Sequence, residues 1–445
     1  MMNAASNGNL SRRLAGAGCA ALVLCAVNAK AATESRGVSL SDVQVQQRYP
    51  WNGLVDIDYT ISCDSGAKLG VDDNLEVWMV DKSIVPAITN RAYTFKQVPL
   101  PMTAGRHRVT WDAHADGVKT RTDVAEFHVE IVHYSEAYMV IDVSGGPDAT
   151  VYPTRFVNRP PAGENGFNTN EYKTDKIVLR RIHPGSYMAG SPEDEFGFNK
   201  SGASDYQHPV VLTKPFYIGV FEITQKQYLN VMGGTNPDAA EDHQGDERPI
   251  GNVTLEQIRG KGWPSVTVPA AATFLGKLLA KCKSANDRGD FTESVAGLDI
   301  PTSFQWEYAC RAGTLGAFNT TNEYDNTSES GQASQMMQLG RYFGNRDTDG
   351  KGGYTGYHTA VGSYLPNAWG LYDMHGNVWE RCRDLKLTDV RTCEIKDPKG
   401  ALSGSVQILK GGGCSEALQF CRSGRYNGDS GTYNSYGFRI IREIP

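Results

Sequence analysis

The segment Trp369-Gly-Leu-Tyr-Asp-Met-His-Gly-Asn-Val-Trp-Glu-Arg-Cys382 constrains the fold of this chain more than any other part of it. It places Asp373, Asn377 and Glu380 close together and interrupts them with glycines. A glycine-bent backbone can turn carbonyl oxygens inward beside carboxylates, and such a cluster of oxygen ligands suits a hard cation such as Ca²⁺. The alternative is a tight turn in which Asx side chains cap backbone groups and the tryptophans pack in a core.

The first 31 residues have the pattern of a secretory signal peptide. Two arginines precede an apolar run from Leu14 to Val27, and Ala-Lys-Ala ends the segment at Ala31. The run is too short to cross a bilayer as a stable helix. We therefore expect residues 1–31 to be removed, leaving a soluble protein, without a membrane anchor, that is secreted or periplasmic.

Length and charge restrict the domain count and the class of partner. The chain has 445 residues and a formal net charge of −6, without a long basic run. Neither nucleic acid nor an anionic membrane is expected to bind such a chain. Its length exceeds what one hydrophobic core normally supports, so we expect more than one domain.

An oxidising compartment makes the cysteines candidates for disulfides. Two of the nine leave with the predicted signal peptide. Cys63 continues the alternation of a strand and Cys282 lies at helical spacing from apolar residues, so both are expected to be packed thiols. The other five gather in the C-terminal third: Cys310, Cys382, Cys393, Cys414 and Cys421.

Residues 33–134 are expected to form an all-β domain. Apolar and polar residues alternate over 55–61 and 127–131, and turn residues separate several such runs. This pattern is typical of a β-sandwich of the immunoglobulin or fibronectin type. Residues 135–173 collect glycine, proline and asparagine, so we expect a linker there.

Residues 174–445 are expected to form a second domain with few and short helices. Thr224 and Gln227, and again Thr302 and Gln305, have the spacing of a capping box, which predicts a helix at each place. Long stretches rich in glycine, asparagine and aspartate separate these helices.

The central segment resembles the signature of the sulfatase-modifying factors, the formylglycine-generating enzyme family. Further similar stretches follow the family's order: residues 214–228, 300–313 and parts of 409–440. The resemblance implies a mixed α+β domain, rich in coil and related to C-type lectins, that calcium ions and disulfides hold together.

The resemblance also implies one calcium site in the central segment. Its ligands would be the side chains of Asp373 and Glu380 and the backbone carbonyls of Gly376 and Val378. Burying two carboxylates without a cation would be costly, which agrees with this expectation.

A disulfide between Cys310 and Cys421 is implied as well, because these positions match a bonded pair of the family. Such a bridge would close a long loop and so restrict the unfolded chain. Cys382 is free to pair with Cys414 or with Cys393, since all three flank the central segment, and the sequence leaves that choice open.

Catalysts of this family oxidise a cysteine of sulfatases to Cα-formylglycine with O₂ and a Cu(I) ion held by two thiolates. Their two cysteines lie five residues apart. Here Cys414 directly follows a Gly-Gly-Gly run, and Cys421 lies seven residues further on. We therefore expect the copper-binding pair to be missing.

The cysteine spacing favours a calcium-stabilised binding or scaffold protein that holds an unidentified protein or glycan. One alternative is an active copper oxidase acting on sulfatases, with Cys414 and Cys421 as its catalytic residues. Another is a non-haem iron enzyme of the same superfamily. His358 and His375 could bind iron or zinc if a third ligand joined them, although isolated histidines more often form ordinary hydrogen bonds in loops.

Overall fold

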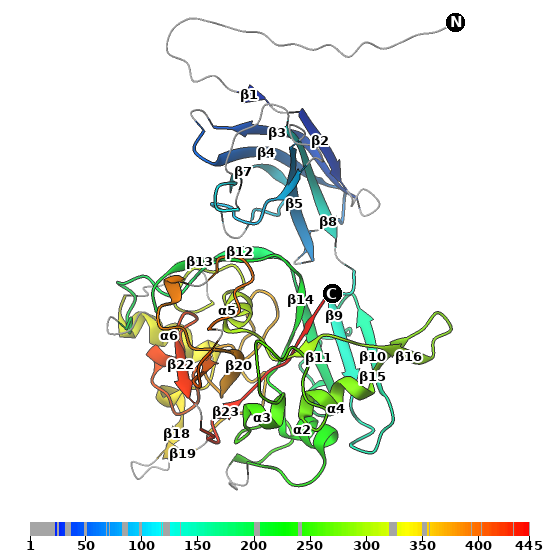
Figure 1. Ribbon diagram of the computed structural model, residues 1–445, viewed down its shortest axis with the longest axis vertical. Helices are drawn as coiled ribbons and strands as arrows, with labels where there is room; N and C mark the ends of the chain where they lie inside the picture. Colours follow the sequence, from blue (N-terminus) through cyan, green and yellow to red (C-terminus); the bar gives the residue numbers. More distant parts are fainter. Residues whose placement is uncertain are drawn as a thin grey trace, which may run out of the picture.

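The chain folds into a strand-rich N-terminal domain and a larger α+β domain, drawn above and below one another in Figure 1. The computed structural model describes residues 23–24, 26–31, 37–48, 51–67, 69–70, 72–81, 88–97, 100–116, 118, 125–133, 135–199, 205–238, 243–319, 327–348, 354–355, 357–392, 394–401, 403–429 and 431–444. None of the helices in these ranges is long and apolar enough to cross a membrane.

The N-terminal domain consists of two four-stranded sheets, as its alternating pattern predicts. Their orders are β1-β3-β4-β7 and β2-β8-β5-β6. Val55, Ile57 and Tyr59 point into the core between the sheets, and Cys63 packs partly buried against it. The strands are β1 (Val23–Leu24), β2 (Ala26–Ala31), β3 (Val38–Gln47), β4 (Leu54–Cys63), β5 (Asp73–Asp81), β6 (Ile88–Arg91), β7 (Gly105–Asp112) and β8 (Ala125–His133).

The edge strands β1 and β2 fall inside the predicted signal peptide. Strand β2 pairs in parallel with β8, and β1 pairs with β3. Residues 1–22 and 25, which make up the rest of that segment, lie outside the described residues. Because β1 and β2 are outermost, cleavage after Ala31 would leave the pairing among the other strands intact. Cleavage itself stays a prediction.

An eight-stranded sheet of order β16-β15-β10-β9-β11-β14-β24-β17 forms the centre of the second domain. Residues 135–173, predicted as a linker, instead supply β9, β10 and helix α1 to it. The glycine-rich turns obscured the short alternation in which Met139 and Ile141 are buried. The strands are β9 (Tyr138–Asp142), β10 (Tyr152–Val157), β11 (Lys176–Ile182), β14 (Phe216–Gly219), β15 (Cys282–Ala285), β16 (Phe291–Ser294), β17 (Leu298–Asp299) and β24 (Ile441–Glu443).

Both faces of this sheet are covered. Ile177 and Leu179 pack on the side of α2 and α4, whereas Val178 packs on the side of α5 and the central segment. Cys282 is buried where α4 gives way to β15, as expected for a packed thiol. The helices are α1 (Asn170–Thr174), α2 (Gln225–Met232), α3 (Leu255–Ile258), α4 (Phe274–Lys281), α5 (Ser303–Arg311) and α6 (Glu329–Leu339), with 3₁₀ turns η3 (Phe343–Asn345), η4 (Val390–Thr392) and η5 (Leu418–Phe420).

Smaller sheets complete the domain beyond α5. One has the order β22-β21-β20-β23, and the others are the pairs β12-β13 and β18-β19. Strand β20 continues directly from the central segment, so this sheet fixes the end of that segment in place. The strands are β12 (Gly185–Ala189), β13 (His208–Leu212), β18 (Asp347–Thr348), β19 (Tyr354–Thr355), β20 (Trp379–Leu385), β21 (Gln407–Lys410), β22 (Tyr426–Asp429) and β23 (Tyr436–Gly437).

The two predicted capping boxes are confirmed at α2 and α5. A third box, which the sequence analysis did not identify, begins the short helix α3 at Thr254. We expect Thr302→Ala to lower the free energy of unfolding by about 1 kcal/mol, because it leaves the partly buried backbone amide of Gln305 without its cap. Thr254→Ala removes the same kind of capping box at a more exposed helix start, so the loss of unfolding free energy should be smaller. Urea unfolding of both variants measures this, and equal losses would contradict it.

Candidate functional site

The central segment forms the sharp, glycine-dependent turn that the sequence predicts. Asp373 and Asn377 have φ values of 55° and 61°, and Gly376 has a φ of 84°. Positive φ is uncommon outside glycine, although aspartate and asparagine tolerate it best. A Cβ on Gly376 would lie 2.1 Å from the backbone oxygen of Arg341, so no other residue fits there without displacing the backbone at Arg341.

The Glu380 carboxylate accepts three short hydrogen bonds from side chains. Arg439 donates from Nε to Oε2 and from Nη2 to Oε1, both at 2.6 Å, and Trp306 Nε1 donates to Oε2 at 2.6 Å. Such a bidentate arginine pair is among the stronger interactions available to a carboxylate. All three side chains are fully buried. The pair therefore joins the central segment to α5 and to the C-terminal run.

A second buried carboxylate, Glu222, supports the turn from the segment after β14. Its Oε2 accepts from Asn377 Nδ2 at 2.6 Å, and its Oε1 accepts from the backbone N–H of Val378 at 3.2 Å. Burial, followed by the charges of Asp373 and Glu380, raises the pKa of Glu222 well above its ordinary value. No pattern in the sequence singled out Glu222, because a lone glutamate after a strand carries no signal.

Asp373 lies beside Glu222 with one oxygen unused. Its Oδ2 accepts from the backbone N–H of Gly362 at 2.6 Å, whereas its Oδ1 has no hydrogen-bond partner among the described residues. Burial raises the pKa of Asp373 to about 6. Three buried carboxyl groups thus lie near one guanidinium, that of Arg439, and the raised pKa values of two of them indicate that burying all three as anions is costly.

The four predicted calcium ligands lie in this one turn, but only some of them are suited to bind a cation. Asp373 offers an orphaned, buried oxygen, which is what a hard cation would bind. Glu380 fits less well, since Arg439 and Trp306 already occupy its two oxygens. The calcium site stays a prediction.

The predicted bridge between Cys310 and Cys421 is not formed in the structure, where both are free and buried. Cys310 Sγ instead faces Ser423 Oγ at 3.6 Å. Ser423 lies two residues after Cys421 in the sequence. Cys382 and Cys414 are also free thiols, and Cys393 lies outside the described residues.

Cys414 and Cys421 are both buried. Burial is the main cause that raises the pKa of Cys421, and the charge of nearby Cys414 adds to it. Burial also raises the pKa of Cys414. Side-chain exposure is close to zero at both positions, so each holds a protonated, enclosed thiol at neutral pH.

His375 is a packing histidine. Its Nδ1 donates to the carbonyl of Cys421 at 2.8 Å, and its Nε2 accepts from the backbone N–H of Asn319 at 3.2 Å. Burial lowers the pKa of His375 to about 4, so the ring is neutral at physiological pH. Both nitrogens are thus engaged within the protein. His358 lies in a different place, beside Asp238.

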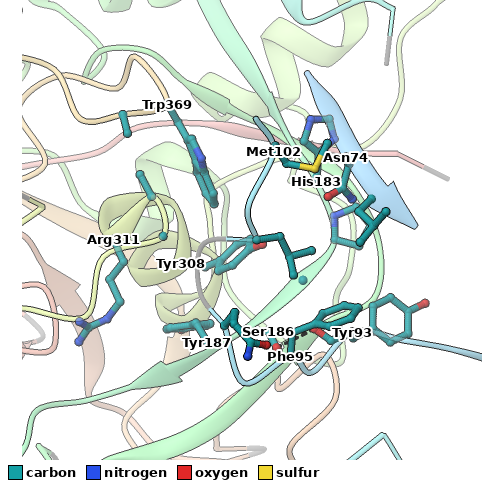
Figure 2. Close-up of a pocket in the computed structure, with 18 of the residues that line it drawn as sticks. Asn74, Tyr93, Phe95, Met102, His183, Ser186, Tyr187, Tyr308, Arg311 and Trp369 are labelled. Atoms are coloured by element: carbon teal, nitrogen blue, oxygen red, sulfur yellow. Dashed lines mark hydrogen bonds between the residues drawn. The ribbon is translucent and has the colours of Figure 1, made fainter. Parts of the chain in front are cut away.

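A cavity of about 470 Å³ lies between the two domains and was not predicted. The larger domain supplies three rings, Tyr187, Tyr308 and Trp369, whose neighbouring centroids lie 5.3 and 5.1 Å apart. Figure 2 shows them beside Phe95 and Met102 of the N-terminal domain. Most of the lining is therefore aromatic or aliphatic.

Direct contacts between the domains hold the walls of this cavity. Ser186 Oγ donates to the carbonyl of Tyr93 at 2.7 Å, and Arg180 pairs with Asp72 at 2.6 Å. Gly185 is required here, because a Cβ on it would lie 2.2 Å from the Tyr308 hydroxyl. The cavity is thus built by the packing of the two domains.

The orphaned oxygen of Asp373 leads to a test of the calcium site. We expect a chelator to lower the melting temperature of the wild-type protein and to have no effect on Asp373→Asn. Glu380→Gln should cost roughly 3–5 kcal/mol with or without calcium, because it leaves Arg439 buried beside a neutral partner. Thermal melts with EDTA or added Ca²⁺ measure both effects, and Asp389→Asn on the surface is the control. A wild-type melt indifferent to chelator would contradict the site.

Comparisons with known proteins agree with the family resemblance of the central segment. Residues 165–444 match the model of the sulfatase-modifying factor enzyme 1-like domain. The chaperone protein LppX of Paenibacillus barcinonensis is 30% identical over 203 residues, which is 42% of this chain and 69% of that protein. The formylglycine-generating enzyme of Thermomonospora curvata is 36% identical over 122 residues, 26% of this chain and 38% of the enzyme.

Among solved structures, PvdO from Pseudomonas aeruginosa is similar with a TM-score of 0.45 and 23% identity, over 60% of this chain and 94% of that one. The mouse formylglycine-generating enzyme is 30% identical over 154 residues, 33% of this chain and 40% of the enzyme. The chain thus matches less than half the length of these two formylglycine-generating enzymes. Through the match over residues 165–444, it belongs to the sulfatase-modifying factor family.

Proposed function

We propose that this protein is a binding member of the sulfatase-modifying factor family that holds an apolar segment of a polypeptide in the cavity between its domains. The cavity carries the proposal, since its size and its mainly apolar walls are those of a ligand site. The name of its relative LppX, a chaperone protein, is consistent with a polypeptide ligand.

The apolar share of the lining favours a peptide, whose apolar side chains the rings and Met102 can cover. Asn74, Gln97 and His183 also line the cavity and could bond the peptide backbone. Arg311 lines the cavity, yet its guanidinium donates to the carbonyl of Gly190 at 2.5 Å and pairs with Glu307 at 2.8 Å. Figure 2 shows this guanidinium pointing away from the aromatic rings. What the rings offer is mainly apolar contact.

Export and calcium binding complete the proposal. The predicted removal of residues 1–31 would place the protein outside the cytoplasm, where unfolded or nascent exported chains expose apolar segments. A cation at Asp373 would offset buried negative charge in the central segment, which also carries Trp369 of the cavity wall, and so stiffen that wall. Neither export nor calcium binding requires a reaction of the cysteines.

Substitution of one ring on each side of the cavity tests the proposal. We expect Trp369→Ala and Phe95→Ala each to weaken binding of apolar peptides by about ten-fold or more, because buried aromatic anchors dominate such sites. Tyr433→Ala is the matched control, since this ring is 56% exposed and lies outside the cavity. Fluorescence anisotropy with hits from a peptide array measures affinity.

Two outcomes would count against a peptide site. One is that peptides bind equally well to all three variants. The other is that only glycans bind, with a loss of affinity in Trp369→Ala, which would assign the same cavity to a sugar. Circular dichroism of each variant establishes that the fold is retained.

Cys414 and Cys421, two free thiols of the same domain, define a second candidate, the copper oxidase. We nevertheless expect the copper-loaded protein to leave a Cys-x-Pro-x-Arg peptide unchanged, because both thiols are enclosed and protonated. Mass spectrometry of the peptide detects the formylglycine aldehyde. Formation of that aldehyde by the wild-type protein, with its loss in Cys414→Ser, would replace the binding protein by the oxidase.

A further inference from the structure

Three metal-ligand side chains converge in the part of the chain that the structure describes, away from the predicted calcium turn. Asp238, His243 and His358 each offer one ligand atom, and these atoms all lie within 4.8 Å of one another. Their exposed fractions are 0%, 6% and 1%. His358 is 120 residues from Asp238 in sequence, so only the fold brings the three together.

Side chains from neighbouring elements fix the backbone of the cluster. Gln225 of α2 donates to the carbonyl of His243 at 2.8 Å, and Arg248 donates to the carbonyl of His358 at 2.8 Å. Asn252 Nδ2 donates at 2.8 Å to the carbonyl just before Asp238. These hydrogen bonds fix the backbone at or beside each of the three residues. The side chains remain directed toward one another.

The contacts inside the cluster are longer than charge-assisted hydrogen bonds usually are. His243 Nδ1 lies 3.3 Å from Asp238 Oδ1, and His358 Nε2 lies 3.4 Å from Asp238 Oδ2. Charge-assisted hydrogen bonds are shorter, at about 2.7–2.9 Å. Two ligands bonded to one tetrahedral Zn²⁺ at roughly 2.0–2.1 Å lie about 3.3–3.4 Å apart.

A contrasting pair occurs in the N-terminal domain. There His133 Nδ1 lies 2.9 Å from Asp73 Oδ1, an ordinary hydrogen-bonding distance. That pair has no third ligand-type side chain among the described residues within reach of both. The wider spacing at Asp238 therefore belongs to the three-residue cluster and is not a general feature of histidine–aspartate pairs in this protein.

Charge also calls for a cation at this place. Asp238 is fully buried, and its Oδ1 has no hydrogen-bond partner in the described part of the chain. Its ion-pair neighbours in that part are two histidines. A buried carboxylate between imidazoles is costly without a bound cation.

We propose that Asp238, His243 and His358 form a two-histidine, one-carboxylate site for a divalent transition-metal ion, Zn²⁺ or Fe²⁺. Two nitrogen ligands suit these ions and disfavour Ca²⁺, which prefers oxygen. Three protein ligands leave at least one coordination position for water or a small ligand. The site is independent of the peptide-binding proposal, since none of its residues lines the interdomain cavity.

Metal titration of the tag-free, chelator-treated full chain tests the site. We expect one equivalent of Zn²⁺, or of Fe²⁺ added anaerobically, by calorimetry and by elemental analysis after gel filtration, and no displacement by excess Ca²⁺. Asp238→Asn and His358→Ala should each weaken binding by at least about 100-fold, because loss of a direct ligand exceeds loss of a supporting residue. Asp73→Asn, which alters the ordinary histidine–aspartate pair, should bind like the wild type.

If a variant fails to fold, X-ray absorption at the metal edge still tests the site, because it reports the ligands of the ion in the wild-type protein. The wild-type protein loaded with one equivalent should show two imidazole ligands and further nitrogen or oxygen neighbours. Less than half an equivalent bound, an imidazole-free spectrum, or equal affinity in Asp238→Asn and Asp73→Asn would overturn the proposal.

Discussion

The ion pair between Glu380 and Arg439 is the interaction on which the larger domain depends. It lies in a water-excluded core, where Trp306 supplies the third hydrogen bond to the carboxylate. Arg439 also donates to the carbonyls of Gly219 and Tyr372, so one guanidinium holds β14, the central turn and the C-terminal run together. Leaving either partner of such a pair alone is strongly unfavourable, which keeps these coil-rich segments in one arrangement.

Further buried carboxylates surround that pair. They hold loops together in a domain whose helices are few and short. Glu222 fastens the turn through Asn377 and Val378, and Asp373 fastens the loop at Gly362. Each carboxylate satisfies backbone donors that no helix or sheet serves. The same arrangement makes the turn a place where a hard cation would be stabilising.

The two domains add features that neither has alone. The cavity takes its walls from both, and its aromatic rings are supported by their own cores. On the far side of the turn, Thr359 donates its backbone N–H to Asn377 Oδ1 and so connects the central segment to the loop that carries His358. An oxygen-rich turn and a nitrogen-containing cluster are thus neighbours that suit cations of different chemistry.

The sequence by itself determined what short-range spacing controls. The capping boxes at Thr224 and Thr302 and the bend at Gly376 follow from residues that lie within a few positions of one another. Only the tertiary structure decided which groups meet across long separations. It brought Arg439 to Glu380, placed a serine opposite Cys310, and joined His358 to Asp238. Such contacts depend on how distant segments pack against a shared core, and local spacing carries no record of that packing.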